Sequence, residues 1–362
     1  MFSKIFKVPL SWLYGFGVDF RNWLYDSKII KSTEFDIPVV CVGNITVGGT
    51  GKTPHVEYLI EFLSKKYNVA VISRGYKRKT KGYILVDIDH TSRQVGDEPK
   101  QIKHKFPNIP VAVCADRVQG IEYLREDHPE INLIIMDDGM QHRRVKPKVN
   151  VALIDINRPI YEDYLLPNGS LRDRRSKLSI AQIVIVTKCP EHIQPIEMRL
   201  IYKNLNLMGY QNLYFSRMGM LKPQPIFPHV VKNNTDVLME GDNVVLMSGI
   251  GNPKHFKDSI SSKYKIIDTI VFTDHHVYKT KDLKLMQQAL KKDMKNVFIV
   301  TTEKDATKLF NSKKIPRYIM ERLYYIPIRC EFINFLNSNS NLNINDEEYF
   351  KRNVIKNVQK NH

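Results

Sequence analysis

A glycine-rich loop, set between an apolar run and a helix-like segment, constrains this chain more than any other feature. The run "VVCVG" precedes "NITVGGTGKT", and "PHVEYLIEFL" follows it. Three glycines allow a tight turn whose N–H groups point at one spot, Lys52 brings an ammonium to bound phosphates, and Thr53 offers a hydroxyl to Mg²⁺. Thr46 stands where the strict pattern has its first glycine, so the loop is a variant. We predict that the nucleotide phosphates are bound by Thr46, Val47, Gly48, Gly49, Thr50, Gly51, Lys52 and Thr53.

A pair of carboxylates is expected beside this loop. The apolar run "INLIIMDDG" contains Asp137 and Asp138 at its end. The carboxyl ends of parallel strands face the ligand crevice, and phosphate-loop proteins hold their Mg²⁺ partly through an acidic residue at such a position. A strand-to-turn cap is the alternative explanation of the two residues. We predict that Asp137 and Asp138, together with Thr53, lie at the metal site.

Short apolar runs alternate with polar, helix-like segments from Phe35 onward. Runs such as "VAVISRG" and "VNVALIDIN" are typical of strands buried on both faces, and their alternation with helices predicts a parallel sheet. A proline-rich connection, "LKPQPIFPHV", precedes a second set of such runs. The predicted fold class is α/β, with a P-loop NTPase-like parallel-sheet domain at residues 35–228 and a second, smaller α/β domain at 229–362 that closes the nucleotide cleft. The polar stretch "NFLNSNSNLNIND" predicts a loose loop before a charged terminal helix.

The N-terminal segment, residues 1–34, carries one apolar stripe at helical spacing and is predicted to be an amphipathic, membrane-facing helical segment. The members of the stripe are Phe6, Leu10, Leu13, Phe16, Phe20 and Trp23. Aromatic and basic residues around the stripe favour contact with an anionic membrane surface. Packing against the chain's own domain is the alternative, and Pro9, Gly15 and Gly17 are expected to break a single long helix. No apolar run reaches the roughly 18 residues that a transmembrane helix needs.

The net charge of +17 indicates an anionic partner, which could be a nucleic acid, an anionic membrane or a phosphorylated substrate. A generally basic composition is the alternative explanation. The basic residues are spread along the chain and none of the usual nucleic-acid-binding motifs occurs, so we expect no nucleic-acid partner. Four cysteines without a CxxC pair predict reduced core thiols rather than disulfides or a zinc site.

The stretch "VIVTKCP" bears on the identity of the nucleotide base. Guanine-reading proteins use Asn/Thr-Lys-x-Asp after a strand. Thr187 and Lys188 are present here, but Pro190 stands where the aspartate is required. Adenine is therefore the expected base. A nucleotide-dependent switch or delivery protein, with slow NTP hydrolysis and no lipid acceptor, is the alternative class of function.

Three further stretches carry candidate chemistry: "QVGDEPK", "FTDHHVY" and "LLPNGSLRDRRS". Each stretch alone also fits an ordinary cap or a structural histidine. An aspartate held by a histidine makes a general base for a sugar hydroxyl, and arginines bind phosphate through a forked pair of donors. Two adjacent histidines rarely point the same way, so a metal site at His275 and His276 is not expected.

The motifs together resemble those of the tetraacyldisaccharide 4'-kinase family, the lipid A 4'-kinases. The stretches that carry the resemblance are "LSWLYGFGVDFRNWLYDS", "VGNITVGGTGKTP", "SRGYKRK", "VGDEP", "ADRVQG", "MDDGMQHRRV", "LLPNGSLRD", "GIGNPKHF", "FTDHHVY" and "VTTEKDA". They occur in order from about residue 10 to about residue 306. The resemblance implies a kinase that transfers the γ-phosphate of ATP to the 4'-hydroxyl of a tetraacyl glucosamine disaccharide 1-phosphate in lipid A biosynthesis. It also implies ATP and Mg²⁺ as cofactors, the lipid disaccharide and an anionic membrane surface as partners, no obligate protein partner, and a peripheral location on the cytoplasmic face of the bacterial inner membrane.

The resemblance further implies roles for single residues. Lys52 contacts the β- and γ-phosphates, Asp97 is the general base and His275 its partner, and Glu98 joins the metal-site residues. The implied substrate-binding residues are Asn44, Arg74, Arg117, Gln141, His142 and Arg172. The chain departs from the family where "LRDRRS" replaces a more usual acidic-Pro ending, so the resemblance gives no role to the last two arginines of that stretch.

Overall fold

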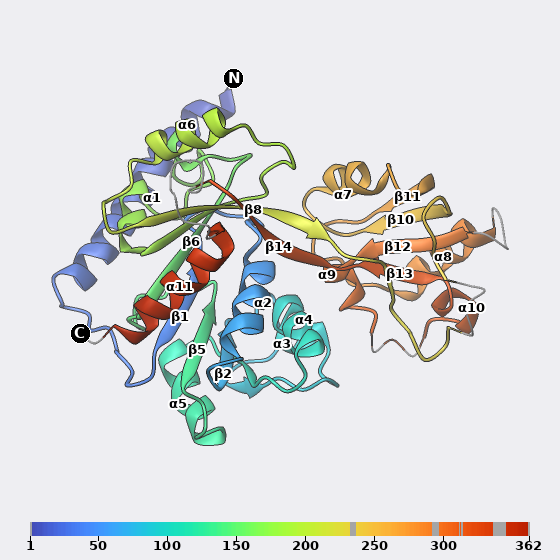
Figure 1. Ribbon diagram of the computed structural model, residues 1–362, viewed down its shortest axis with the longest axis horizontal. Coiled ribbons are helices and arrows are strands. Elements are labelled where there is room, and N and C mark those ends of the chain that lie inside the picture. Colours follow the sequence, from blue (N-terminus) through green and yellow to red (C-terminus); the bar gives the residue numbers. More distant parts are fainter. Residues whose placement is uncertain are drawn as a thin grey trace.

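Two β-sheets organise the part of the chain that the structure describes (Figure 1). The computed structural model describes residues 2–231, 237–291, 297–310, 312, 314–335 and 345–360. Within these ranges the larger sheet has nine strands in the order β14-β8-β7-β6-β1-β5-β2-β4-β3. The smaller sheet has five strands in the order β11-β10-β12-β13-β9.

The larger sheet is parallel from β8 to β4, and its two edge strands, β14 and β3, are antiparallel to their neighbours. Its strands are β1 (Val39–Gly43), β2 (Val69–Ser73), β3 (Ile84–Leu85), β4 (Val111–Val113), β5 (Leu133–Asp137), β6 (Val149–Asp155), β7 (Ile183–Thr187), β8 (Asn212–Met220) and β14 (Ile328–Ile333). Most of these strands are buried along their whole length, since helices cover both faces. The predicted α/β class with a large parallel sheet is confirmed.

Side chains that alternate along the strands divide the core into two layers. Val39 and Cys41 of β1 pack in the layer that α5 and α6 also line, whereas Val40 and Val42 pack in the layer lined by α2, α4 and α11. The helices and 3₁₀ helices around this sheet are α2 (Lys52–Leu63), α3 (Ser92–Val95), α4 (Asp97–Lys105), α5 (Arg117–Asp127), η1 (Ile160–Glu162), η2 (Arg175–Ile180), α6 (Pro195–Leu205) and α11 (Asp346–Gln359). All four cysteines are buried and free, which confirms the prediction of core thiols.

The smaller sheet has its own core and adjoins the larger one through β8, β14 and α9 (Figure 1). Its strands are β9 (Gln224–Pro225), β10 (Asn243–Ser248), β11 (Lys265–Val271), β12 (Val297–Thr302) and β13 (Leu323–Ile326). The first four in spatial order, from β11 to β13, are parallel, and β9 closes the edge in the antiparallel sense. The helices here are α7 (Pro253–Ile260), α8 (Thr280–Lys291), α9 (Glu303–Ala306) and α10 (Arg317–Met320).

The end of the chain returns to the larger sheet. Strand β14 pairs with β8 from Ile328 opposite Met220 to Ile333 opposite Phe215, and α11 packs Phe350 into the core beneath it. The range 229–362, which the sequence predicted as the second domain, therefore contains elements of both sheets. The predicted terminal helix is confirmed as α11. Of the loop predicted before it, residues 336–344 lie outside the described ranges.

Helix α1 (Phe2–Asp26) is continuous, so the expected break at Pro9, Gly15 or Gly17 is wrong. Tertiary contacts override the weak propensity: Ser11 donates a hydrogen bond to the backbone oxygen of Leu165 at 2.8 Å. Gly15 acts as a packing residue, because a Cβ there would lie 2.9 Å from Nη2 of Arg174. Among the described residues, no helix has the length and apolarity to cross a bilayer.

Candidate active site

The glycine-rich loop joins β1 to α2 in the geometry that phosphate binding requires. Gly48 and Gly51 have φ angles of +96° and +83°, which residues with a Cβ rarely adopt. Gly51 is also crowded, since a Cβ there would lie 2.4 Å from Cε of Met218. Lys52 and Thr53 are the first two residues of α2, so the loop leads directly to the free N–H groups of a helix N-terminus.

Two of the predicted substrate residues contact the loop itself. Asn44 is fully buried, and its Nδ2 donates to Oγ1 of Thr46 at 3.3 Å and to Oγ1 of Thr50 at 3.0 Å. Gln141 donates from Nε2 to the backbone oxygen of Asn44. Both side chains therefore hold the loop in shape.

Sequence reasoning missed a second set of residues that hold the loop. Lys188 donates from Nζ to the backbone oxygen of Gly49 and forms an ion pair with Asp155 at 2.7 Å. Arg158 donates from Nη1 to the backbone oxygen of Val47 at 2.9 Å and also pairs with Asp155. The sequence did contain a signal, because Asp155 ends the apolar strand β6 as Asp137 ends β5. The lysine of "VIVTKCP" contacts the loop, a role that the guanine-reading pattern does not predict.

Asp137 and Asp138 lie beside the loop, as the sequence predicted. Asp137 ends β5 and is paired in register with Val42 of β1, the strand that enters the loop. Oδ1 of Asp138 lies 3.5 Å from Nζ of Lys52, and its Oδ2 lies 3.4 Å from Nη1 of Arg172. Asp138 has a φ of +49°, an uncommon conformation that often occurs at functional sites.

The two carboxylates have opposite pKa shifts. Burial, with a contribution from the neighbouring Asp138 charge, raises the pKa of Asp137 to about 7. Burial also acts to raise the pKa of Asp138, but Lys52 and Arg172 outweigh it and hold that pKa below its ordinary value. Such a split between adjacent carboxyl groups is typical of sites that bind a cation or move a proton.

The Asp137 carboxyl group fits a role in holding Mg²⁺. Its Oδ1 is buried and makes no hydrogen bond within the described part of the chain, while its Oδ2 accepts only a long one, 3.4 Å, from Ser73. No group of three His, Cys, Asp or Glu side chains gathers into a metal cage among the described residues. Mg²⁺ needs no such cage, since it is usually held by one or two carboxylates together with substrate phosphates and water.

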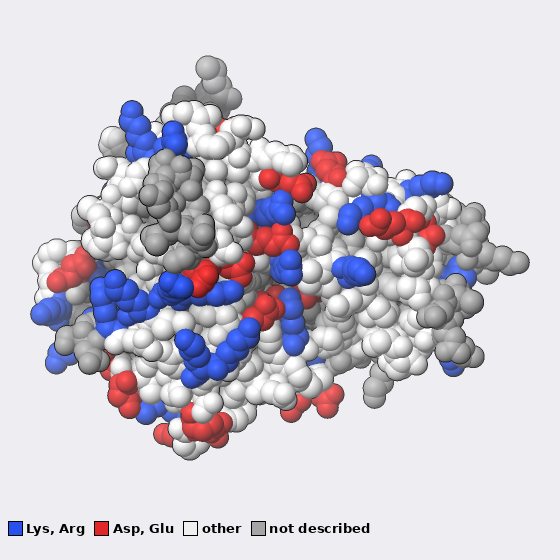
Figure 2. Space-filling model, in the orientation of Figure 1, with Lys and Arg blue, Asp and Glu red and all other residues white. Residues whose placement is uncertain are grey.

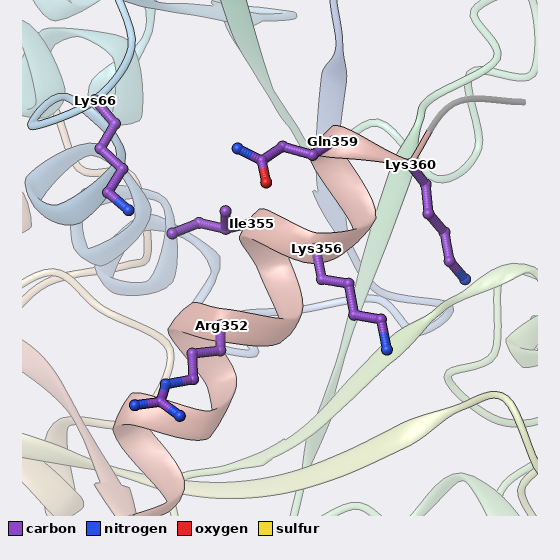
Figure 3. A pocket seen from close by; sticks show the side chains of 6 residues that line it. All are labelled: Lys66, Arg352, Ile355, Lys356, Gln359 and Lys360. Atoms are coloured by element: carbon purple, nitrogen blue, oxygen red, sulfur yellow. The ribbon is translucent and has the colours of Figure 1, made fainter.

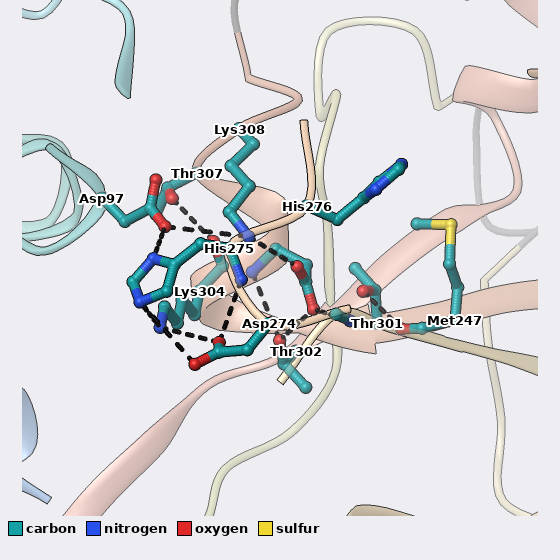
Figure 4. A network of polar contacts seen from close by, with 12 residues as sticks. Asp97, Met247, Asp274, His275, His276, Thr301, Thr302, Lys304, Thr307 and Lys308 are labelled. Carbon is teal, nitrogen blue, oxygen red and sulfur yellow. Dashed lines mark hydrogen bonds and ion pairs between the residues drawn. The ribbon is translucent and has the colours of Figure 1, made fainter. Parts of the chain in front are cut away.

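The predicted base and its partner are in contact. Oδ2 of Asp97, at the start of α4, accepts a hydrogen bond from Nδ1 of His275 at 2.9 Å (Figure 4). Burial acts to raise the pKa of Asp97, but the His275 hydrogen bond and the nearby lysines lower it below the ordinary value. His276 points elsewhere, because its Nε2 lies 2.8 Å from Asp282 and its ring stacks on Phe272. The two imidazoles therefore contact different carboxylates.

The remaining predicted residues lie around the carboxylates. Glu98, the second residue of α4, is close enough to contribute to the raised pKa of Asp137. Arg117 is buried, and its backbone N–H donates to Nε2 of His142 at 3.3 Å. Burial and the Arg117 charge lower the pKa of His142 to about 4, so its imidazole is neutral at neutral pH. Arg74 directly follows β2, and its positive charge contributes to the lowered pKa of Arg117.

Two surface hollows lie away from these residues. One, of about 410 Å³, is lined by Lys66, Arg352, Ile355, Lys356, Gln359 and Lys360 at α11 (Figure 3). The other, of about 460 Å³, lies beside α2 and β14 and includes Glu57 and Lys105. Neither hollow contains a predicted site residue, and the active site is therefore located by the side-chain geometry described above.

Comparisons with known proteins agree with this geometry. A family model described as tetraacyldisaccharide-1-P 4'-kinase matches residues 3–343. The tetraacyldisaccharide 4'-kinase of Phocaeicola vulgatus is 42% identical over 356 residues, which cover 98% of this chain and 94% of that protein. The protein of the same name from Porphyromonas gingivalis is 43% identical over 333 residues, covering 90% and 92%.

A solved structure gives the same result for the fold. The "apo" form of LpxK from Aquifex aeolicus, in complex with ATP, matches with a TM-score of 0.73 at 24% identity and covers 97% of this chain and 98% of its own. The family model and the two relatives each cover most of the chain, and they therefore assign the family as well as the fold. The chain belongs to the tetraacyldisaccharide 4'-kinase family and is a kinase of lipid A biosynthesis.

Proposed function

We propose that this kinase transfers the γ-phosphate of ATP to the 4'-hydroxyl of a tetraacyl glucosamine disaccharide 1-phosphate, with Asp97 as the general base. The observation that carries the proposal is the His275–Asp97 hydrogen bond of 2.9 Å, next to a Glu98 whose charge acts on Asp137 beside the phosphate loop. A nucleotide site and a base for a hydroxyl are thereby joined through one helix, α4.

The phosphate loop supports the nucleotide part of the proposal. Lys52 is paired with Asp138 and lies at the start of α2, where a β- or γ-phosphate would replace the carboxylate as its partner. Thr53 is half-buried one position further along the helix. We assign Mg²⁺ to Thr53, Asp137, Asp138 and Glu98. Bound there, the ion would neutralise charge on the β- and γ-oxygens.

Asp97 is suited to receive the proton of the acceptor hydroxyl. Oδ2 is occupied by His275 and by Lys308, whose Nζ lies 3.7 Å away, and Oδ1 points away from both (Figure 4). As Oδ1 takes the proton, the 4'-oxygen forms its bond to the γ-phosphorus, and the bond to the β–γ bridging oxygen breaks to release ADP. Positioning and charge stabilisation supply most of the catalysis in such transfers.

Arginines near the site suit an acceptor that already carries phosphate. Arg172 faces Asp138 at 3.4 Å, and the positive charge of Arg74 lies close enough to Arg117 to contribute to the lowered pKa of that guanidinium. Burial is the main cause of the lowered Arg117 pKa, and Arg74 is the next. An anionic group placed between two like charges relieves their repulsion. We assign substrate contacts to Arg74, Arg117, His142 and Arg172, and loop-supporting contacts to Asn44 and Gln141.

Helix α1 supports a peripheral position on an anionic membrane. Leu10, Leu13, Phe16, Phe20 and Trp23 of the apolar stripe are each more than half exposed, at 54%, 69%, 70%, 52% and 53%. Trp12 beside them is 76% exposed. The opposite side of the helix packs on the protein through buried residues such as Val18. The stripe is therefore free to enter a bilayer surface, and we assign the enzyme to the cytoplasmic face of the inner membrane.

The experiment that tests the function follows the lipid. Purified protein is incubated with Mg-ATP and the disaccharide 1-phosphate in detergent, and the lipid is analysed by mass spectrometry. Gain of one phosphoryl group, absent with Lys52→Ala, is the expected result. Nucleotide hydrolysis that does not depend on the lipid would instead support a switch or delivery protein.

A further inference from the structure

Two lysines near helix α9 face the Asp97–His275 pair, and neither belongs to the roles assigned above. Nζ of Lys304 lies 3.3 Å from Nε2 of His275 and 3.2 Å from Oδ1 of Asp274 (Figure 4). Nζ of Lys308 lies 3.7 Å from Oδ2 of Asp97. The sequence stretch "VTTEKDA" places Lys304 directly after β12, on a short helix whose cap is well formed.

Lys308 is held in place by the buried core of the smaller sheet. Lys308 pairs with Oδ1 of Asp305 at 2.9 Å, and Asp305 is fully buried. The other Asp305 oxygen accepts from the backbone N–H of Gly249 and from the hydroxyl of Thr302, both at 2.8 Å. The contact of Lys308 with Asp97 is therefore anchored to this core through Asp305.

The chemistry of the contact decides which ring nitrogen of His275 carries hydrogen. An ammonium group has three donors and no acceptor, so Nε2 must accept the hydrogen bond from Lys304. Nδ1 then carries the ring hydrogen and donates it to Asp97. This arrangement leaves His275 neutral and leaves Asp97 with one oxygen occupied.

Lys304 also contacts the carboxylate of Asp274, which lies near the same ring nitrogen. Its Oδ2 lies 3.7 Å from Nε2 of His275, close enough to attract a second ring hydrogen. Lys304 stands between the two groups and pairs with the Asp274 carboxylate. The other groups around this point are Asp97 from α4, Glu98 at 3.9 Å from Lys304, and the ring of Tyr76 against the imidazole.

We propose that Lys304 is a positioning residue, which holds His275 as the neutral Nδ1–H form by donating to Nε2 and by occupying Asp274. The proposal deepens the proposed function, on which it rests for its link to turnover. Without Lys304, Nε2 would carry a hydrogen and donate it to Asp274. In a neutral ring, Nδ1 would then lack a hydrogen and could not donate to Asp97, whereas a charged imidazolium would still donate to Asp97 but would make that carboxylate a weaker base.

The test is a spectroscopic one on the whole protein. The ¹⁵N resonances of the His275 ring are assigned by their loss in His275→Gln, and protein labelled at histidine is then examined. We expect Nε2 to be unprotonated in the unsubstituted protein at neutral pH and protonated in Lys304→Met. Lys304→Arg, which keeps a donor, should preserve the original spectrum. A protonated Nε2 in the unsubstituted protein, or an unchanged spectrum in Lys304→Met, would overturn the proposal.

Kinetic measurements and a rescue variant distinguish the loss of a positioning role of Lys304 from the loss of folded protein. Lys304→Met should lower kcat by about 10- to 100-fold, with the KM values for ATP and lipid changed by less than about threefold. Adding Asp274→Asn to Lys304→Met should restore part of kcat and an unprotonated Nε2, which a destabilised protein would not do. Lys281→Met, an exposed lysine on α8, is the matched control. If the unsubstituted protein phosphorylated no lipid, the proposed function would fail, while the spectra would still decide the role of Lys304.

Discussion

Nδ1 of His275 lies 2.9 Å from Oδ2 of Asp97, although 178 positions separate the two residues along the chain. Asp97 begins α4 on the larger sheet, and His275 follows β11 of the smaller one. The pair that we propose as base and partner thus exists only when the two sheets are brought together. The surface where the two sheets adjoin carries both acidic and basic side chains (Figure 2). A relative motion of the sheets that separated α4 from the end of β11 would break the hydrogen bond of the pair.

The first prediction concerns this pair. Asp97→Asn and His275→Gln should each lower kcat by roughly 10²- to 10⁴-fold, because one removes the base and the other its hydrogen bond. The kcat of the double variant should be only slightly lower than that of the less active single variant, because both changes disable the same functional unit. Single-turnover phosphoryl transfer measures this directly. Losses that multiply in the double variant would show that the two residues act separately.

The second prediction concerns Lys52. Its ammonium lies 3.5 Å from Asp138, and in the proposed function it contacts the transferring phosphate. Lys52→Ala should lower kcat by roughly 10³-fold or more, as expected for loss of a charge that stabilises the transition state. The melting temperature should change far less than turnover, because Arg172 remains paired with Asp138. Lys65→Ala, just beyond α2 and exposed, is the control and should retain full turnover.

The sequence predicted this loop and its carboxylates because each is a local pattern. A strand, a glycine turn and a helix start specify the loop within about fifteen residues, and a strand ending in Asp137 specifies its neighbour. Contacts between distant segments carry no such local signal. The hydrogen bonds of Lys188 and Arg158 to loop carbonyls require the order β7-β6-β1 in the sheet, which the sequence alone did not supply.

The same reason explains the two differences in the fold. The pairing of β14 with β8 joins segments about a hundred residues apart, and composition does not reveal it. Helix α1 contains residues that lower helix propensity, but the loop that ends in Arg174 packs against Gly15 and is paired with Asp19 at 2.7 Å. That contact also gives Arg174 the structural role that the motif comparison left open. Arg175 likewise donates to the backbone oxygen of Asp163.

The third prediction concerns pH and Asp137. Its folded-state pKa of about 7 exceeds the ordinary 3.8, so the folded protein keeps a proton that the unfolded chain releases. The free energy of unfolding should therefore fall as pH rises through this interval and stay constant above about pH 7. Asp137→Asn should remove the decrease in the free energy of unfolding that Asp137 causes below about pH 7. At pH 8 the variant should have a free energy of unfolding higher by a few kcal/mol at most. Urea unfolding between pH 5 and 8 measures this pH dependence. The same dependence in Asp137→Asn as in the unsubstituted protein would contradict the raised pKa of Asp137.

The fourth prediction follows from the same carboxyl group. A metal ligand must be deprotonated, so Mg-nucleotide binding near pH 7 should release a proton from Asp137. Calorimetry in two buffers of different ionisation enthalpy measures the number of protons released. The release should approach one proton at slightly acidic pH, vanish above about pH 8, and be absent in Asp137→Asn. Equal binding enthalpies in both buffers at pH 6.5 would show that Asp137 is already ionised.

The fifth prediction concerns the exposed stripe of helix α1. Leu13 and Phe16 are 69% and 70% exposed, and burying each in a bilayer surface should contribute about 1.5–3 kcal/mol. Leu13→Asp with Phe16→Asp should therefore lower partition onto vesicles containing anionic lipid by at least about 100-fold, since 1.4 kcal/mol corresponds to a tenfold change. Turnover of substrate dissolved in detergent should remain within about threefold of the original. Met239→Asp, at a 64% exposed apolar residue before β10, is the matched control. If both proteins floated equally with vesicles, the stripe would have another partner and another surface would have to bring the enzyme to its lipid.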